Sequence, residues 1–154
     1  MPKVIRPDMN GAGRRFAIVA GMFNEDIVKR LVDGAVGVLT SHGVKDGDIT
    51  IAWVPGVFEV PLAARRLATQ GRYMGVICVG AVIQGETMHD VYVSENAARG
   101  ISEVSRDTGV PCTFGIITAH DRDQAVARSG PEVNRGAEAA EAALEMAHLL
   151  TRLE

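Results

Sequence analysis

Cysteines and metal-ligand patterns are scarce in this chain. It contains two cysteines, Cys78 in an apolar run and Cys112 directly after Pro111. Neither belongs to a CxxC spacing, and no pair of histidines lies near either one in the sequence. This pattern argues against a disulfide framework and against a zinc-type site. We expect both cysteines to be packing residues, and we expect no bound metal.

Basic runs and long apolar runs are also missing. The formal net charge is -3 and hydrophobic residues make up 47% of the chain. These values argue against disorder and against a nucleic-acid-binding face. The apolar runs are far shorter than a bilayer span, and the start of the chain lacks the apolar core of a signal peptide. The sequence predicts a cytoplasmic protein that binds neither nucleic acid nor membrane.

Two regions can be separated by their composition. Residues 1–14 show no sustained hydrophobic period and contain two prolines and two glycines. We interpret them as an extended arm that needs a partner surface to become ordered. The remaining residues, 15–154, are too few for two ordinary domains. We therefore expect an N-terminal arm, 1–14, followed by a single domain, 15–154.

Strand and helix patterns alternate along the domain. Apolar and β-branched runs predict strands at residues 15–20, 49–54, 76–79 and 113–118. The expected helices run from an Asn24 cap to Gly43, from after Gly56 to Gly71, over residues 89–108, over residues 121–129 and from about Arg135 onward. The last helix is alanine-rich, and its apolar residues Ala139, Ala143, Met146, Leu150 and Leu153 are expected along one side.

This alternation is typical of right-handed βαβ units with helices on both faces of a parallel sheet. The predicted fold class is α/β, a flavodoxin-like three-layer α/β/α sandwich with a four-stranded parallel sheet. Ligands bind such sheets outside the carboxyl ends of the strands. Three polar clusters fall there, at residues 23–24, 57–59 and 81–89. Together they predict a small-molecule pocket.

The third cluster carries the most specific chemistry. We expect Gly80 and Gly85 to let the chain turn sharply, which leaves the peptide N–H groups around Glu86 and Thr87 free to bind an anion. His89 follows at the start of a helix, and an imidazole side chain can take or give a proton near neutral pH. The competing interpretation is that His89 only caps the helix or lies on the surface.

Four motifs, in this order, resemble the lumazine synthase family of riboflavin biosynthesis. They are VPGVFEVP, GAVIQGETMH, FGIIT and QAVAR followed by NRG. The resemblance implies an enzyme that condenses 5-amino-6-(D-ribitylamino)uracil with 3,4-dihydroxy-2-butanone 4-phosphate. The products are 6,7-dimethyl-8-ribityllumazine, phosphate and water, in the penultimate step of the pathway. It also implies that no cofactor is needed.

The resemblance also implies roles for individual residues. His89 would move protons as the catalytic residue. The ribitylaminouracil would be bound by Phe23, Asn24, Val57, Phe58, Glu59, Ala81, Val82, Ile83 and Phe114. The phosphate of the butanone substrate would be bound by Gly85, Glu86, Thr87 and Arg128, with Arg135 as a further candidate.

An assembly is implied as well. Phe114 and Arg128 are expected to lie away from the pocket of their own chain, and in the family the matching residues complete the site of an adjacent subunit. Family members form homopentamers, some of which build sixty-subunit shells, and the arm adds a strand to a neighbouring sheet. Riboflavin synthase is a candidate partner. The alternative is a monomer with a frayed arm.

Several residues depart from the family pattern. Gln84 stands where arginine is frequent, Asp90 where an aromatic residue is common, and Arg135 where lysine is frequent. Glu86 places a carboxylate in the anion loop, so we expect only its backbone N–H to contribute. These departures bear on substrate affinity.

Other interpretations remain open at this point. One rival function is a carrier that binds flavin or lumazine, or the related archaeal-type riboflavin synthase. Another is a phosphate-sensing or signalling domain, although the first strand ends in AGMFN, without the acidic residues that would hold magnesium. A third is a shell-forming protein without activity.

Several single residues also have two readings. The pair His120 and Asp121 could be catalytic, but Asp121 as a helix cap is favoured. We expect His42 and His148 on the surface. Met22 and Phe23 could be core residues instead of ligand contacts.

Overall fold

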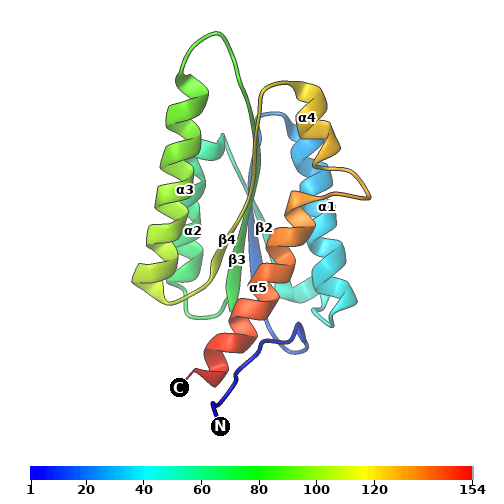
Figure 1. The fold of residues 1–154 in the computed structure, drawn as a ribbon, viewed down its shortest axis with the longest axis vertical. Helices are drawn as coiled ribbons and strands as arrows, with labels where there is room; N and C mark the ends of the chain where they lie inside the picture. Colours follow the sequence, from blue (N-terminus) through cyan, green and yellow to red (C-terminus); the bar gives the residue numbers. More distant parts are fainter. Residues whose placement is uncertain (154) are drawn as a thin grey trace.

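A computed structural model describes residues 1–153 and contains one parallel sheet with helices on both faces (Figure 1). The strands are β1 (Phe16–Gly21), β2 (Ile49–Val54), β3 (Gly75–Ile83) and β4 (Cys112–Ala119). They pair in the order β2-β1-β3-β4, and every pairing is parallel. All four predicted strands are confirmed, although β3 continues to Ile83 and is longer than expected.

The helices form the two outer layers of the sandwich. They are α1 (Glu25–Ser41), α2 (Val60–Ala68), α3 (His89–Thr108), α4 (Arg122–Ala127) and α5 (Arg135–Arg152), with short 3-10 turns at η1 (Asp46–Asp48) and η2 (Val57–Glu59). In Figure 1, α2 and α3 lie on one side of the sheet and α1, α4 and α5 on the other. The predicted flavodoxin-like α/β sandwich is confirmed.

The two layers bury alternate residues of the same strands. On β1, Phe16, Ile18 and Ala20 join the core under α1 and α5, whereas Ala17 and Val19 join the core under α2 and α3. This follows from the period of two along a strand. Because both faces are covered, the central strands β1 and β3 are apolar almost throughout. Cys78 is fully buried in this interior, where burial raises the pKa of its thiol well above the usual range.

The apolar side expected on the last helix is buried only in its first half. Ala139 and Ala143 are buried, whereas Met146, Leu150 and Leu153 are exposed. The buried positions continue instead through Leu144 and Ala147. Small residues on this side bring α5 close to α1, and a Cβ on Gly136 would collide with the backbone oxygen of Leu31.

Residues 1–14 form no helix or strand and lie beside the C-terminal end of α5 (Figure 1). The backbone N–H of Asp8 donates to His148 Nδ1 at 3.0 Å, and His148 Nε2 lies 3.2 Å from an Asp8 carboxylate oxygen. Gly11 N–H donates to His42 O at 2.8 Å. His148 is therefore not a simple surface residue, since its side chain is only 17% exposed. Pairing of the arm with a neighbouring sheet stays a prediction.

Within residues 1–153, no helix has the length and apolar character needed to cross a membrane. In the same residues, no three side chains of histidine, cysteine, aspartate or glutamate gather as a metal site would require.

Candidate functional site

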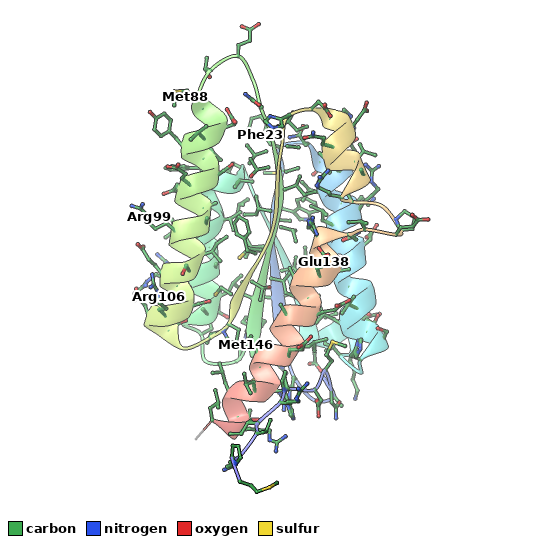
Figure 2. The ribbon with its side chains drawn as sticks, in the orientation of Figure 1. Phe23, Met88, Arg99, Arg106, Glu138 and Met146 are labelled. Atoms are coloured by element: carbon green, nitrogen blue, oxygen red, sulfur yellow. The ribbon has the colours of Figure 1, made fainter. Side chains whose placement is uncertain are left out.

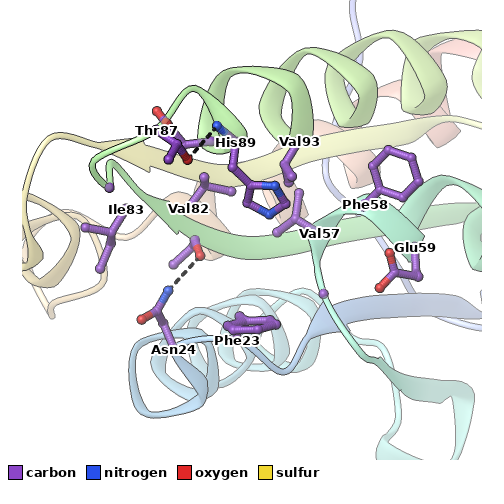
Figure 3. Close-up of a pocket in the computed structure, with 14 residues that line it drawn as sticks. Phe23, Asn24, Val57, Phe58, Glu59, Val82, Ile83, Thr87, His89 and Val93 are labelled. Atoms are coloured by element: carbon purple, nitrogen blue, oxygen red, sulfur yellow. Dashed lines mark hydrogen bonds between the residues drawn. The ribbon is translucent and has the colours of Figure 1, made fainter.

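A pocket of about 610 Å³ opens at the carboxyl ends of β1, β2 and β3 (Figure 3). The three predicted clusters meet there. Its lining residues are Phe23, Asn24, Gly56, Val57, Phe58, Glu59, Ala81, Val82, Ile83, Gly85, Thr87, His89, Asp90 and Val93. The volume is in the range of pockets that bind small molecules. Polar groups are few and separate, as expected of a site that orients a flat ligand.

The aromatic wall comes from the turn after β1. Phe23 is 74% exposed and lies on the side of the pocket opposite His89 in Figure 3. Met22 is also exposed, so the alternative that this pair belongs to the core is wrong. Asn24 adopts a left-handed conformation, with φ of 58°, and turns the chain sharply into α1. An exposed ring held at the mouth of a pocket can stack on a planar ligand.

The predicted cap at Asn24 is wrong in its chemistry. Its side chain makes no hydrogen bond to the first turn of α1. Instead, Nδ2 donates to the backbone oxygen of Ala81 at 3.0 Å, shown as a dashed line in Figure 3. Asparagine tolerates the left-handed conformation, which points its amide across the sheet and away from the helix. The bond ties the β1 turn to the end of β3 and so fixes two sides of the pocket.

The turn after β2 provides a buried wedge and an acidic group. Val57 is buried, Glu59 is half-buried and Phe58 is exposed. A Cβ on Gly56 would stand 3.4 Å from the ring of Phe23 and 3.6 Å from Glu59 Oε1. The bare backbone of Gly56 thus forms the floor between the aromatic ring and the carboxylate.

The predicted turn at Gly80 is wrong, because Gly80 lies inside β3 and pairs with Ile116 of β4. The apolar residues that follow it extend the strand to Ile83. A Cβ on Gly80 would stand 2.5 Å from Val57 Cγ2. Gly80 therefore allows the Val57 wedge to pack against the sheet, which is a role in close approach and not in chain reversal.

The loop between β3 and α3 carries the proposed anion site and the histidine. Gly85 and Thr87 line the pocket, whereas Glu86 is exposed and does not line it. Met88, the N-cap residue, makes no capping hydrogen bond with its side chain, and the Thr87 hydroxyl accepts only a long bond of 3.4 Å from His89 N at the positive end of α3. The ring of His89 projects from the first residue of α3 into the pocket (Figure 3). The place of this loop suits an anion next to a proton donor.

The charges of the pocket are incomplete for an anionic ligand. Its ionisable lining groups are Glu59, His89 and Asp90, and no lysine or arginine is among the described lining residues. Two carboxylates repel a phosphate, and a helix end supplies only about half a positive charge. The described lining of one chain therefore offers no lysine or arginine side chain to a phosphate.

The predicted basic and aromatic partners lie elsewhere in the chain. Phe114 pairs with Cys78 in the sheet and is exposed. Arg128 donates from NH1 to Gln124 O at 2.9 Å, at the end of α4. Arg135 forms an ion pair of 2.6 Å with Glu138. None of the three lines the pocket, which agrees with the expectation that Phe114 and Arg128 lie away from it.

Sequence reasoning missed three lining residues: Gly56, Asp90 and Val93. Val93 could have been found, because it lies four residues after His89 on the same face of α3. The choice between the readings of His120 and Asp121 is decided for Asp121 as a cap, because Asp121 Oδ1 accepts from Gln124 N at 2.9 Å.

One comparison with known proteins bears on this site. A family model described as 6,7-dimethyl-8-ribityllumazine synthase matches residues 13–151. The match spans the whole sheet, every helix layer and all three turns that line the pocket.

Proposed function

Since the chain belongs to the 6,7-dimethyl-8-ribityllumazine synthase family, a transferase family of riboflavin biosynthesis, we propose that it performs the reaction of that name. It condenses 5-amino-6-(D-ribitylamino)uracil with 3,4-dihydroxy-2-butanone 4-phosphate, and the products are 6,7-dimethyl-8-ribityllumazine, phosphate and water. The observation that carries this proposal is the single pocket that holds an exposed aromatic ring, a carboxylate and a histidine beside a helix start.

The pyrimidine substrate fits the side of the pocket formed by β1 and β2. Its flat ring stacks on Phe23, and its edge bonds to the backbone of residues 81–83. The ribityl chain extends toward Glu59, whose carboxylate accepts hydrogen bonds from two hydroxyl groups. Asn24 supports this arrangement because its bond to Ala81 O keeps the stacking ring and the backbone edge at a fixed separation.

The butanone phosphate fits the other side of the pocket. Its phosphate sits at Gly85, Glu86 and Thr87, near the positive end of α3, with only the backbone of Glu86 contributing. Arg128 of an adjacent subunit supplies the cation that the lining of one chain lacks. Phe114 of that subunit closes the aromatic side of the site. Arg135 is a weaker candidate, because its guanidinium is already paired with Glu138.

The reaction then needs a series of proton transfers. An amine of the pyrimidine attacks the ketone carbon, and loss of water gives an imine. Removal of a proton next to the imine expels phosphate and leaves an enol, which tautomerises to a ketone. The second amine attacks that ketone and closes the ring with loss of water. The presence of His89 in the lining of the same pocket supports a role in accepting and returning protons at these steps.

This arrangement requires an oligomer. A homopentamer with sites at the interfaces brings Arg128 and Phe114 of one subunit to the pocket of the next. The exposed arm residues 1–4 are free to reach a neighbour, and pairing with an exposed sheet edge would cover unpaired backbone groups.

The direct test is to mix the purified protein with both substrates and follow the lumazine by absorbance and fluorescence. A protein-free mixture is the essential control, because the two substrates also react without an enzyme. We expect faster formation of product that saturates in both substrates. Tight binding of lumazine or riboflavin without acceleration would favour the carrier function instead.

A further inference from the structure

The loop 84–88 holds the proposed phosphate site, yet it has little support of its own. All five of its residues are exposed. The side-chain hydrogen bond between the loop and the first residue of α3 is a long one, from His89 N to Thr87 Oγ1 at 3.4 Å. An exposed loop with weak internal bonds samples several conformations, and each one that misplaces its N–H groups weakens anion binding.

Gln84 ties the start of this loop to the end of β4. Its backbone N–H donates to Ala119 O at 2.8 Å. Its side-chain oxygen Oε1 accepts from Nδ1 of His120, with 2.5 Å between the two atoms. Gln84 therefore binds the last residue of β4 with its backbone and the residue after β4 with its side chain, immediately before Gly85 enters the pocket lining.

His120 is itself held in place by α4. Its backbone N–H donates to Oε1 of Gln124 at 2.8 Å, and Gln124 N donates to Oδ1 of Asp121 at 2.9 Å. Since the oxygen of Gln84 can only accept, Nδ1 of His120 is the donor in this bond. The backbone of His120 is thus held just before the capped start of α4, and its imidazole is held by the bond to Gln84.

We propose that Gln84 and His120 form a positioning pair that fixes loop 84–88 for binding of the butanone phosphate. The inference rests on the proposed function and deepens it. Neither residue lines the pocket, so the pair acts through the loop and touches neither substrate. It therefore affects binding of the phosphate substrate, while stacking of the pyrimidine on Phe23 and proton transfer by His89 continue.

The pair makes a distinct kinetic prediction. Loss of the hydrogen bond raises the KM for the butanone phosphate by about three- to tenfold, the equivalent of one neutral hydrogen bond. The KM for the pyrimidine and kcat each change by less than about twofold, since the groups that serve them are untouched. A general loss of folded protein would lower kcat and leave both KM values unchanged.

Four variants separate the pair from its surroundings. Gln84→Met keeps the length of the side chain and removes the acceptor, and His120→Ala removes the donor. His120→Asn keeps an N–H donor near the position of Nδ1 and is expected to restore the wild-type KM. His42→Asn is the matched control, because His42 bonds to Val38 O at the C-terminal end of α1. It is expected to leave both KM values unchanged.

Binding of inorganic phosphate, measured by calorimetry, gives a second readout that needs no turnover. We expect Gln84→Met and His120→Ala to weaken it by the same three- to tenfold factor as the KM. An active wild type whose KM and phosphate affinity survive both substitutions would overturn the positioning pair alone. A wild type without activity, in which Gln84→Met still weakens phosphate binding, would overturn the proposed function and leave the pair intact.

Discussion

The pocket at the carboxyl ends of β1, β2 and β3 differs in its charged groups from the surface formed by α4 and the start of α5. The pocket brings together aromatic side chains, two carboxylates and a histidine, and its described lining holds no lysine or arginine. The other side carries Arg122, Arg128 and Arg135 (Figure 2 shows the side chains around α5). Arg122 is paired with Asp26 and Arg135 with Glu138.

This difference bears on which parts of the molecule supply the groups that bind the two substrates. The pocket of one chain can stack on a flat ring, accept hydrogen bonds and transfer protons, but its described lining holds no lysine or arginine to neutralise a phosphate. Arg128 has no carboxylate partner among the ion pairs of residues 1–153, and its NH1 bonds only to a backbone oxygen. In the proposed function, the pocket of one chain and Arg128 of its neighbour form one site, as is expected of sites shared at an interface.

The largest effect is expected at the pocket edge, from His89→Ala. Loss of a general acid and base lowers kcat by about a hundredfold or more. Activity remains above the protein-free rate, because the pocket still holds both substrates in contact. Initial rates at saturating substrate measure this. A folded variant that is no faster than the uncatalysed mixture would contradict the claim that proton transfer by His89 and the proximity of the substrates both contribute to the rate.

The second largest effect is expected from a substitution at the end of α4. Arg128→Ala is expected to lower kcat/KM for the butanone phosphate by about ten- to a hundredfold, since a charge-assisted bond to phosphate is lost. The KM for the pyrimidine is expected to stay constant. Arg135→Ala is the matched control and should have a smaller effect, because Glu138 already pairs with its guanidinium. Equal losses in the two variants would remove the distinction between them.

A third prediction concerns the packing beneath the pocket. Gly80→Ala places a methyl group against Val57 Cγ2. The free energy of unfolding is expected to fall by about 1–3 kcal/mol through overpacking. Chemical denaturation measures the change, and Gly47→Ala serves as a control because a Cβ there meets nothing within 4 Å. An unchanged free energy of unfolding in Gly80→Ala would show that Val57 can move to accommodate the added methyl group.

The smallest effect is expected from Glu59→Gln. An amide keeps one acceptor oxygen but loses the charge, so the KM for the pyrimidine is expected to rise by about three- to tenfold. The KM for the butanone phosphate is expected to stay the same or to fall slightly, since one negative charge leaves the pocket. A larger rise for the phosphate substrate than for the pyrimidine would reverse the proposed orientation of the two substrates.

The fold could be predicted from the sequence because the periodicity of hydrophobic residues marks its strands and helices. The strand pattern at residues 49–54 and the helix over 89–108 coincide with β2 and α3. The same pattern could not show that β3 runs through Gly80, because a glycine inside a strand and a glycine in a turn look alike until the neighbouring Val57 is known. The exposed Met146 and Leu150 likewise follow the helical period without being buried.

The candidate site was predictable where its residues follow strand ends. Phe23, Glu59 and His89 were assigned to one pocket from chain order alone, and the structure brings them together. The bonds from Asn24 to Ala81 and from Gln84 to His120 join residues far apart in the chain, so no local pattern could indicate them.

The shared site is tested most directly by combining two variants of low activity. His89→Ala and Arg128→Ala chains are unfolded, mixed in equal amounts and refolded together, and lumazine formation is compared with that of each variant refolded alone. If His89 and Arg128 of one site come from different chains, random assembly restores both residues in about a quarter of the sites. At limiting butanone phosphate, the mixture is then about threefold or more as active as either parent. A mixture no more active than the average of the two would contradict the account.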